Sequence, residues 1–316
     1  MAVPAGTFQT YQSIGTREDL EDTIYNISPT DTPFLSAIDK VSITRHIHEY
    51  QLDTLATATN TGFVEGDVAS AGTSTPTVRI ASVTQIFERV AQISTTQEAE
   101  KQAGRASELS YQLMKRGKDI VNSTEVAISQ KKSQALATGT TVRFLGGAET
   151  WIKTNRVDNG TGTTPGYANQ ATGTVTDGTQ VTFTEADLLT ALGNAWTSGG
   201  EPDLIILGKR NKGKLDGFDG IATLQRDAGE KVTIVASADA YRSPYGTHKL
   251  QLSRFSRDRT VLVLDTNLWA LGRLDSLRTR PLAINGLSLR REIYQEVTLI
   301  SRNEAASSKV ADRLTT

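Results

Sequence analysis

The stretch TTQEAEKQAGRASELSYQLMKRGKDIVNSTEVAISQKKSQALAT, residues 95–138, decides how the rest of the chain is interpreted. Apolar pairs recur in it every seven residues, which is typical of a helix with a narrow apolar stripe. These pairs are Leu113-Met114, Ile120-Val121 and Ala127-Ile128, with Ala135 one repeat further on. Thr95 and Glu98 have the spacing of a capping box and predict the helix start. Unbroken, the helix would span about 60 Å, like a spine, although Gly104 and Gly117 are points where it could bend or stop. Periodicity alone fits an ordinary core helix or a coiled-coil segment equally well.

The segment before this helix, residues 41–94, has a β-like pattern at both ends and predicts a long hairpin. Between the two arms, residues 56–77 hold six Thr, four Ala and three Gly but few large apolar side chains. Such a connection cannot build a core of its own, so it must lie on something else or stay mobile. We therefore interpret it as the tip of a reaching arm.

The first 39 residues carry one base, Arg17, against six acids, a net charge of −5. Pro29 and Pro33 exclude a continuous helix there and favour extended backbone before each proline. These features predict an arm over residues 1–40 that ends in an apolar anchor at residues 34–38. A disordered acidic terminus is the alternative.

Downstream, residues 155–180 contain seven Thr and five Gly, typical of a surface loop or a β-hairpin at a subdomain boundary. Thr184 and Asp187 then predict a capped helix, which is followed by a buried strand at 204–207. Further strands are predicted at 231–235, 247–252, 260–265, 269–274 and 288–300. The class is therefore mixed α and β.

Composition excludes several kinds of chemistry. The chain has 316 residues, with 34 Lys and Arg against 35 Asp and Glu, so no overall charge drives it towards DNA or an anionic membrane. It has no cysteine, which excludes disulfides, iron–sulfur clusters, cysteine-ligated zinc and a thiol nucleophile. No secretion signal and no apolar run of 18 residues occurs, so we expect a soluble protein made in a cytoplasm.

Residues 208–215, GKRNKGKL, match a phosphate-cradling loop except at the last position. Leu215 stands where Ser or Thr would ligate magnesium, while Asp265 follows an apolar strand and could act as a partner carboxylate. A degenerate nucleotide hydrolase is thus one alternative function. The favoured interpretation is a basic helix start at a subunit surface.

Other candidate sites are weaker. His46 and His48 would share one strand face, but the third histidine, His248, is distant in sequence, so a polar strand face is preferred to a metal site. Residues 249–291 hold nine bases and three acids, a bias that fits phosphate backbone, an acidic partner segment or solvated strand faces. The Thr and Gly content leaves a β-rich adhesion or tail-tube protein as a further alternative. No catalytic, cofactor-binding or metal-binding residue is predicted.

Several short motifs occur in one order along nearly the whole chain. They are Pro29-Thr30-Asp31-Thr32-Pro33-Phe34, Glu49-Tyr50-Gln51-Leu52-Asp53-Thr54-Leu55, Glu65-Gly66-Asp67, Ser110-Tyr111-Gln112-Leu113, Ser243-Pro244-Tyr245-Gly246, and Glu296-Val297-Thr298-Leu299 through Ala305. In this order they resemble the major capsid proteins of tailed bacteriophages.

The resemblance implies an α+β fold, the tailed-phage major capsid protein fold, with discontinuous domains. Residues 1–40 would be the N-terminal arm. Residues 41–144 would form the first part of a peripheral domain, with an extended β-hairpin loop at 46–93 and a spine helix at 95–138. An axial domain would occupy 145–270, and 271–316 would return strands to the peripheral domain and end in a C-terminal tail.

The function that the resemblance implies is structural. The chain would self-assemble through pentamers and hexamers into an icosahedral head enclosing double-stranded DNA, in the virion and not in a membrane. Its partners would be its own copies, scaffold, portal and decoration proteins, and packaged DNA bound non-specifically. Contacts between subunits are expected at Pro33, Phe34, Glu65, Asp67, Arg79 and Arg89.

Two departures from some relatives carry expectations. No lysine lies between Val41 and Glu100, so a lysine-to-asparagine crosslink cannot start in the extended loop, and shell stabilisation is expected to be non-covalent or to depend on cement proteins. Fewer than 30 residues precede Ser28, too few for a fused helical scaffold, so a separate scaffold is expected.

Overall fold

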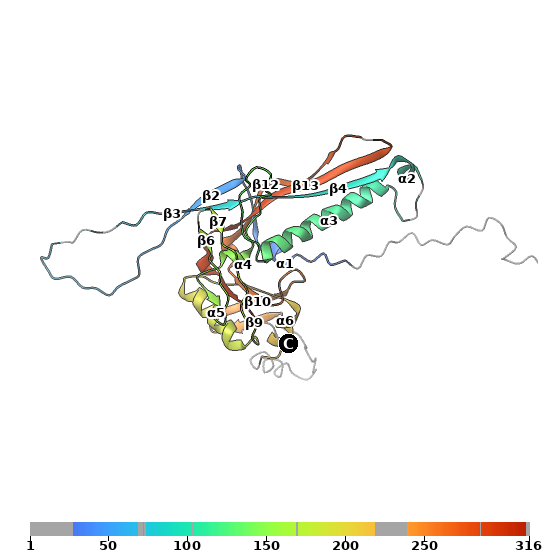
Figure 1. Ribbon diagram of the computed structural model, residues 1–316. Coiled ribbons are helices and arrows are strands. Elements are labelled where there is room, and N and C mark those ends of the chain that lie inside the picture. The colour runs from blue at the N-terminus through green and yellow to red at the C-terminus, as the bar shows by residue number, and fades with distance from the viewer. Residues whose placement is uncertain are drawn as a thin grey trace, which may run out of the picture.

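The computed structural model describes residues 28–68, 72, 74–100, 102, 104–168, 170–218, 239–284 and 286–313. Figure 1 shows a long helix lying along an elongated sheet, a second sheet beside one end of that helix, and a hairpin projecting from the body. Helices and strands are mixed rather than alternating as βαβ units. The predicted α+β class is confirmed.

The peripheral sheet has four strands in the order β1-β12-β13-β4. Its strands are β1 (Asp39–Ser42), β12 (Trp269–Pro281), β13 (Ser288–Ser301) and β4 (Gln85–Ser94). β1 runs parallel to β12, whereas β13 is antiparallel to both of its neighbours. Helix α3 (Glu108–Ser129) packs against β4 and β13, and its apolar stripe buries Ile120 and Ile128 in the core.

The helix predicted over residues 95–138 is interrupted around Gly104, one of the two glycines expected as possible breaks, and it ends at Ser129 rather than at residue 138. The structure has a short helix α2 (Thr95–Ala99), a break that contains Gly104 at a φ of +74°, and then α3, whose 22 residues extend about 33 Å. A positive φ is incompatible with a continuing right-handed helix. Gly117, by contrast, lies inside α3 without interrupting it.

The predicted capping box at Thr95 was wrong, because the polar groups cap different helices. Ser94 is the N-cap of α2, and its hydroxyl accepts a hydrogen bond from the Gln97 amide at 3.1 Å. Glu98 instead caps α3: it accepts hydrogen bonds from the Ser107 hydroxyl at 2.6 Å and the Leu109 amide at 3.0 Å. These bonds hold the pKa of the Glu98 carboxyl below its ordinary value. Glu98, which the sequence predicted at the start of a single helix, therefore links α2 to α3.

The axial sheet has six strands in the order β5-β14-β11-β8-β10-β9. They are β5 (Arg156–Val157), β14 (Ser308–Val310), β11 (Val261–Leu264), β8 (Leu204–Leu207), β10 (Gly246–Leu252) and β9 (Ala240–Ser243). In β8, Leu204 and Ile206 join the core shared with α3, whereas Ile205 and Leu207 face the core of helix α5 (Glu185–Thr197). Because both faces are covered, this strand is apolar at every position.

Several predictions in this region are confirmed. The Thr184–Asp187 capping box is present at the start of α5. Residues 155–180 contain a small hairpin of β6 (Tyr167–Ala168) and β7 (Ala171–Thr172). The predicted strand at 231–235 lies outside the described residues. The domain division itself stays a prediction. Two strand pairings bear on it: β4 pairs with β13 in the four-stranded sheet, and β14 pairs with β11 in the six-stranded sheet.

The remaining elements are short. They are α1 (Pro33–Ala37), α4 (Ala148–Trp151), α6 (Lys209–Leu215), η2 (Thr266–Leu268) and η3 (Glu304–Ala306). Trp151 of α4 stacks on Tyr167 with ring centroids 5.4 Å apart.

An ion network joins the chain just after α3 to the axial sheet. Arg257 bridges Glu149 at 2.8 Å and Asp177 at 2.7 Å, and Asp177 also accepts Lys131 at 2.5 Å. Burial raises the pKa of the Glu149 carboxyl. Partial burial would also raise the pKa of Asp177, but the hydrogen bonds that Asp177 accepts from Arg257 and Lys131 outweigh it and lower that pKa.

Candidate assembly surface

The projecting element is the hairpin of β2 (Ile47–Leu52) and β3 (Val78–Val83), which pair from Ile47↔Val83 to Leu52↔Val78. The connection between them, residues 53–77, is called the tip segment below. Of its described residues, none lies in a helix or strand. Figure 1 shows the hairpin and tip segment extending from the body on the side away from α2. The predicted hairpin is present but shorter than the expected 41–94, because β1 and β4 pair with β12 and β13 instead. The described residues of its tip contribute no buried core, as predicted.

The tip segment exposes apolar side chains to an unusual degree. Leu55 is 99% exposed, Val68 88%, Phe63 85% and Val64 78%. Large apolar side chains that project from the body in this way mark an interaction surface.

The charge of the tip segment has one sign. Its ionisable residues are Asp53, Glu65 and Asp67, and no base occurs between His48 and Arg79. Within the paired strands, Glu49 and Arg79 form an ion pair from β2 to β3, with the Arg79 side chain 65% exposed. A surface that receives the tip segment should therefore be apolar with bases at its rim.

Polar side chains from elsewhere in the chain hold the root of the hairpin. The Tyr50 hydroxyl donates to the carbonyl of Ser301 at 2.6 Å, and burial raises the pKa of Tyr50 to about 12. Gln134 donates to the Ala81 carbonyl at 2.9 Å, and the Ala81 amide donates to the Tyr167 hydroxyl at 2.8 Å. The root is thus fixed to the subunit, which directs the tip segment outward.

The N-terminal arm enters the body through α1. Phe34 is fully buried, and its ring meets Trp269 edge-on at 6.1 Å. The amides of Phe34 and Leu35 donate to the two carboxylate oxygens of Glu125 on α3, at 3.0 and 2.8 Å. The predicted apolar anchor at 34–38 is confirmed by the burial of Phe34 and Ile38.

The six residues expected at subunit contacts do not form one cluster. Phe34 is a correction: a side chain fully buried in its own subunit cannot reach a neighbour. Pro33 is partly exposed at the first position of α1. Glu65, Asp67 and Arg79 are exposed on the hairpin, and Arg89 is exposed on β4, where it donates to Ser123 at 3.3 Å.

The residues that hold these elements in place carry almost no signal in the sequence. Glu125, Gln134 and Tyr167 act through contacts with residues at least 51 positions away. A polar residue at position 125, beside the apolar stripe of α3, was the only available signal.

The proposed phosphate-cradling loop is absent from the part of the chain that the structure describes. Gly208 is the N-cap of α6 and residues 209–215 are helical, so no loop exists there to surround a phosphate. An added Cβ at Gly208 would lie 2.5 Å from a carboxylate oxygen of Asp258, which places negative charge where a phosphate would sit. Asp265 caps η2 by accepting from the Asn267 amide at 3.2 Å. The nucleotide alternative was wrong, and the helix start is confirmed.

The remaining candidates are structural. His48 packs beside Tyr50, and within the described residues no group of three metal-ligating side chains is found. The bases of 249–291 are dispersed: Arg257 and Arg259 are ion-paired beside the axial sheet, whereas Arg278 and Arg280 pair with acids on β12 and β13. None of the helices in the described ranges combines the length and apolarity that a membrane crossing requires.

Comparison with known proteins shows which family this chain matches. The sequence signature of the SU10 major capsid protein family matches residues 3–313. A curated relative, the major capsid protein of Escherichia phage Phieco32, is 28% identical and covers 95% of each chain.

Solved structures agree with this match. The capsid asymmetric unit of cyanophage A-1(L) matches with a TM-score of 0.70 at 10% identity, covering 97% of this chain and 99% of the other. The capsid of a native GTA particle matches with a TM-score of 0.66 at 12% identity, covering 96% and 98%. The predicted capsid fold is confirmed, and the adhesion or tail-tube alternative finds no support.

Proposed function

Because this chain belongs to the SU10 major capsid protein family, we propose that its copies associate into hexamers and pentamers by laying each tip segment on a neighbouring copy. The chain is a phage major capsid protein, a structural protein that forms the virion shell, and not an enzyme. The observation that carries the proposal is the exposure of Leu55, Phe63, Val64 and Val68 on a segment with no core of its own.

The energetics favour a neighbouring copy as the surface that covers the tip segment. Burying one such side chain contributes about 1.5–3 kcal/mol, whereas ordering each residue costs about 1–2 kcal/mol. One tip segment therefore binds weakly. A closed ring of identical copies repeats the contact at every interface, and each copy is held by two neighbours.

The exposed residues at the edges of this contact have a supporting role. Glu65 and Asp67 flank the apolar side chains of the tip segment, while Pro33, Arg79 and Arg89 are exposed to varying degrees elsewhere on the subunit. We propose that these residues select the partner orientation, because charges at an interface rim contribute more to specificity than to affinity. Phe34 is excluded from this group by its burial.

We also propose the wider set of partners. The rings would close into an icosahedral head around double-stranded DNA, with non-specific contact to the DNA backbone. Scaffold, portal and decoration proteins would complete assembly. Support for these partners comes from the family relationship alone.

The experiment is to replace residues 56–77 with a Gly-Ser linker of equal length. The variant should remain soluble and unfold at the wild-type temperature, because the described residues of the tip segment contribute nothing to the buried core. In light scattering and sedimentation it should fail to form particles. Normal particles would contradict the proposal, and an unfolded subunit would contradict the independence of the tip segment.

A further inference from the structure

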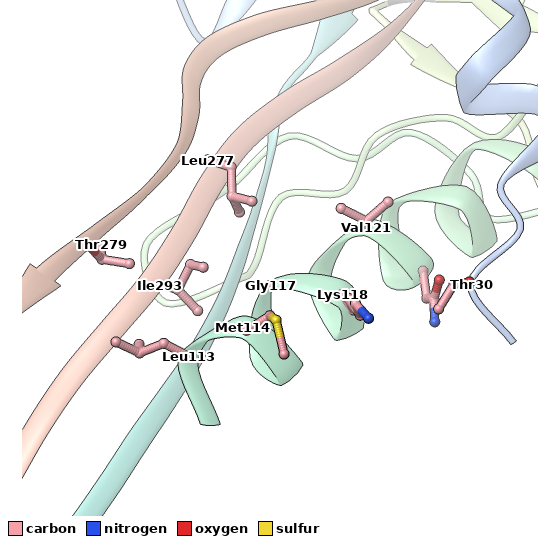
Figure 2. Close-up of a pocket in the computed structure, with 10 residues that line it drawn as sticks. Thr30, Leu113, Met114, Gly117, Lys118, Val121, Leu277, Thr279 and Ile293 are labelled. Carbon is pink, nitrogen blue, oxygen red and sulfur yellow. The ribbon is translucent and has the colours of Figure 1, made fainter. Parts of the chain in front are cut away.

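An apolar groove runs between α3 and the β12–β13 pair, with a volume of about 470 Å³. Figure 2 shows Leu113, Met114 and Val121 on the helix side, facing Leu277 and Ile293 on the strands. Its size is that of a site for a small ligand or a short peptide. Met114 is 56% exposed, so an apolar floor here is left open to solvent.

The groove exists because the peripheral sheet is only partly covered. α3 packs on β4 and β13, and the far half of β12 lies beyond it. On its outer edge β12 pairs with β1 only from Ala270 to Arg273. Between Asp275 and Pro281, within the described parts of the chain, this edge has no strand partner. An extended segment could therefore pair with the free edge of β12 and, in the same position, fill the groove.

The chain itself passes the rim of this groove. Asn122 on α3 donates a hydrogen bond to the carbonyl of Pro29 at 2.9 Å, and Thr30 lines one end of the groove. The residues that precede this point in the sequence are Leu20-Glu21-Asp22-Thr23-Ile24-Tyr25-Asn26-Ile27. Four of the eight are large and apolar, and two are acidic.

We propose that the groove is the docking surface for residues 20–27 of the same chain. The span of α3 from Leu113 to Asn122 is about 14 Å, and eight extended residues reach about 26 Å, so the segment is long enough. Since Thr30 is already at the rim, the segment is held near the groove at high effective concentration.

Charge favours the same occupant. Lys118 lines the groove. It forms no ion pair with any residue in the described ranges. Glu21 and Asp22 would arrive beside this lysine, which suits the acidic bias of the N-terminal arm.

The rival occupant is the tip segment of a second copy, which is also apolar and acidic. It lacks the tether, however, and competition with an attached segment disfavours it. The two occupants differ in a measurable way, because residues 20–27 would contact α3 within one chain and the tip segment would do so between chains.

The absence of native cysteine allows a direct test in the full chain, with a short bis-maleimide as the crosslinker. Ile24→Cys with Met114→Cys should crosslink within one chain. The matched control is Ile24→Cys with Lys115→Cys, in which the second thiol is on the next residue of the helix and faces away from the groove. This pair should react about tenfold less. Phe63→Cys with Met114→Cys tests the rival occupant.

The outcomes separate on a denaturing gel, confirmed by mass spectrometry of the linked peptides. A linked peptide within one chain for Ile24 and Met114, at about tenfold over the control, supports the proposal. A dimer band from Phe63 and Met114 overturns it in favour of the tip segment. Equal reaction of Met114→Cys and Lys115→Cys, a link between chains, or no link overturns it as well. Because the test works on unassembled subunits, its failure is distinguishable from a failure of assembly.

Discussion

The backbone amide of Phe34 donates a hydrogen bond to the carboxylate of Glu125 at 3.0 Å, across 91 residues of sequence. The second oxygen of Glu125 accepts the Leu35 amide at 2.8 Å. Helix α1 has no side-chain cap from its own N-cap, Thr32, so Glu125 supplies the acceptors that its first amides need. Burial raises the pKa of the Glu125 carboxyl. The N-terminal arm is therefore anchored by a buried acid of the long helix.

Removing this acid should destabilise the subunit. Glu125→Ala leaves one buried and one half-buried amide without acceptors and should lower the free energy of unfolding by about 2–4 kcal/mol. Glu125→Gln keeps one acceptor oxygen and should lose about half as much. Denaturant unfolding measures both. Asp119→Ala, a more exposed acid on the same helix, is the control, and equal losses at the two positions would show that Glu125 is not the anchor.

A charge on the apolar stripe of α3 should prevent folding. Ile120 is fully buried, so Ile120→Asp places an unpaired carboxylate in the core at a cost of about 4 kcal/mol or more. Insoluble expression or a large loss of melting temperature is expected. Lys115→Asp, at an exposed site of the same helix, should fold normally. A soluble Ile120→Asp subunit with wild-type melting would refute the placement of the stripe.

Lys309 should make stability depend on pH. Its ammonium donates to the Glu149 carbonyl and to Thr164, and burial lowers the pKa of Lys309 from 10.5 to about 8. Between those two values the unfolded chain binds more protons than the folded one, so the contribution of Lys309 to stability rises with pH.

The measurement is the difference in unfolding free energy between the wild type and Lys309→Met, whose side chain has similar length and no charge. This difference should shift in favour of the wild type as the pH increases from 8 towards 10. A constant difference over that window would show that the buried ammonium keeps its ordinary pKa.

Point changes in the tip segment should weaken assembly without affecting the fold. Phe63→Ser with Val64→Ser removes about 3–6 kcal/mol of potential burial per contact. The concentration needed for assembly should increase by at least about tenfold, while subunit melting stays unchanged. Asn60→Ser, a polar change in the same segment, is the control. If both variants assemble like the wild type, the apolar side chains do not form the contact.

The sequence predicted correctly those elements that are determined by residues close together in the chain. β8 is four consecutive apolar residues, and the structure buries all four. The capping box at Thr184 and Asp187 is set by residues three positions apart. A seven-residue stripe does not say where a helix begins or ends, so over residues 95–138 it marked neither the break that contains Gly104 nor the end of α3 at Ser129.

Elements that depend on distant partners could not be predicted in this way. β14 contains Ser308 and Lys309, which carry no strand signal, and Lys309 is buried through a bond to Glu149, 160 positions away. Phe34 was correctly recognised as an anchor but wrongly expected at a subunit contact. The sequence does not distinguish an exposed apolar residue from a buried one. Only the fold, which places Trp269 beside Phe34, shows that Phe34 is buried.

Electron microscopy of shells assembled from the purified full chain tests the central claim most directly. We predict closed shells built of hexamers and pentamers, with density for each tip segment, residues 53–77, lying on the adjacent subunit. Open tubes, particles of a single compact subunit, or tip segments folded back on their own subunit would contradict it.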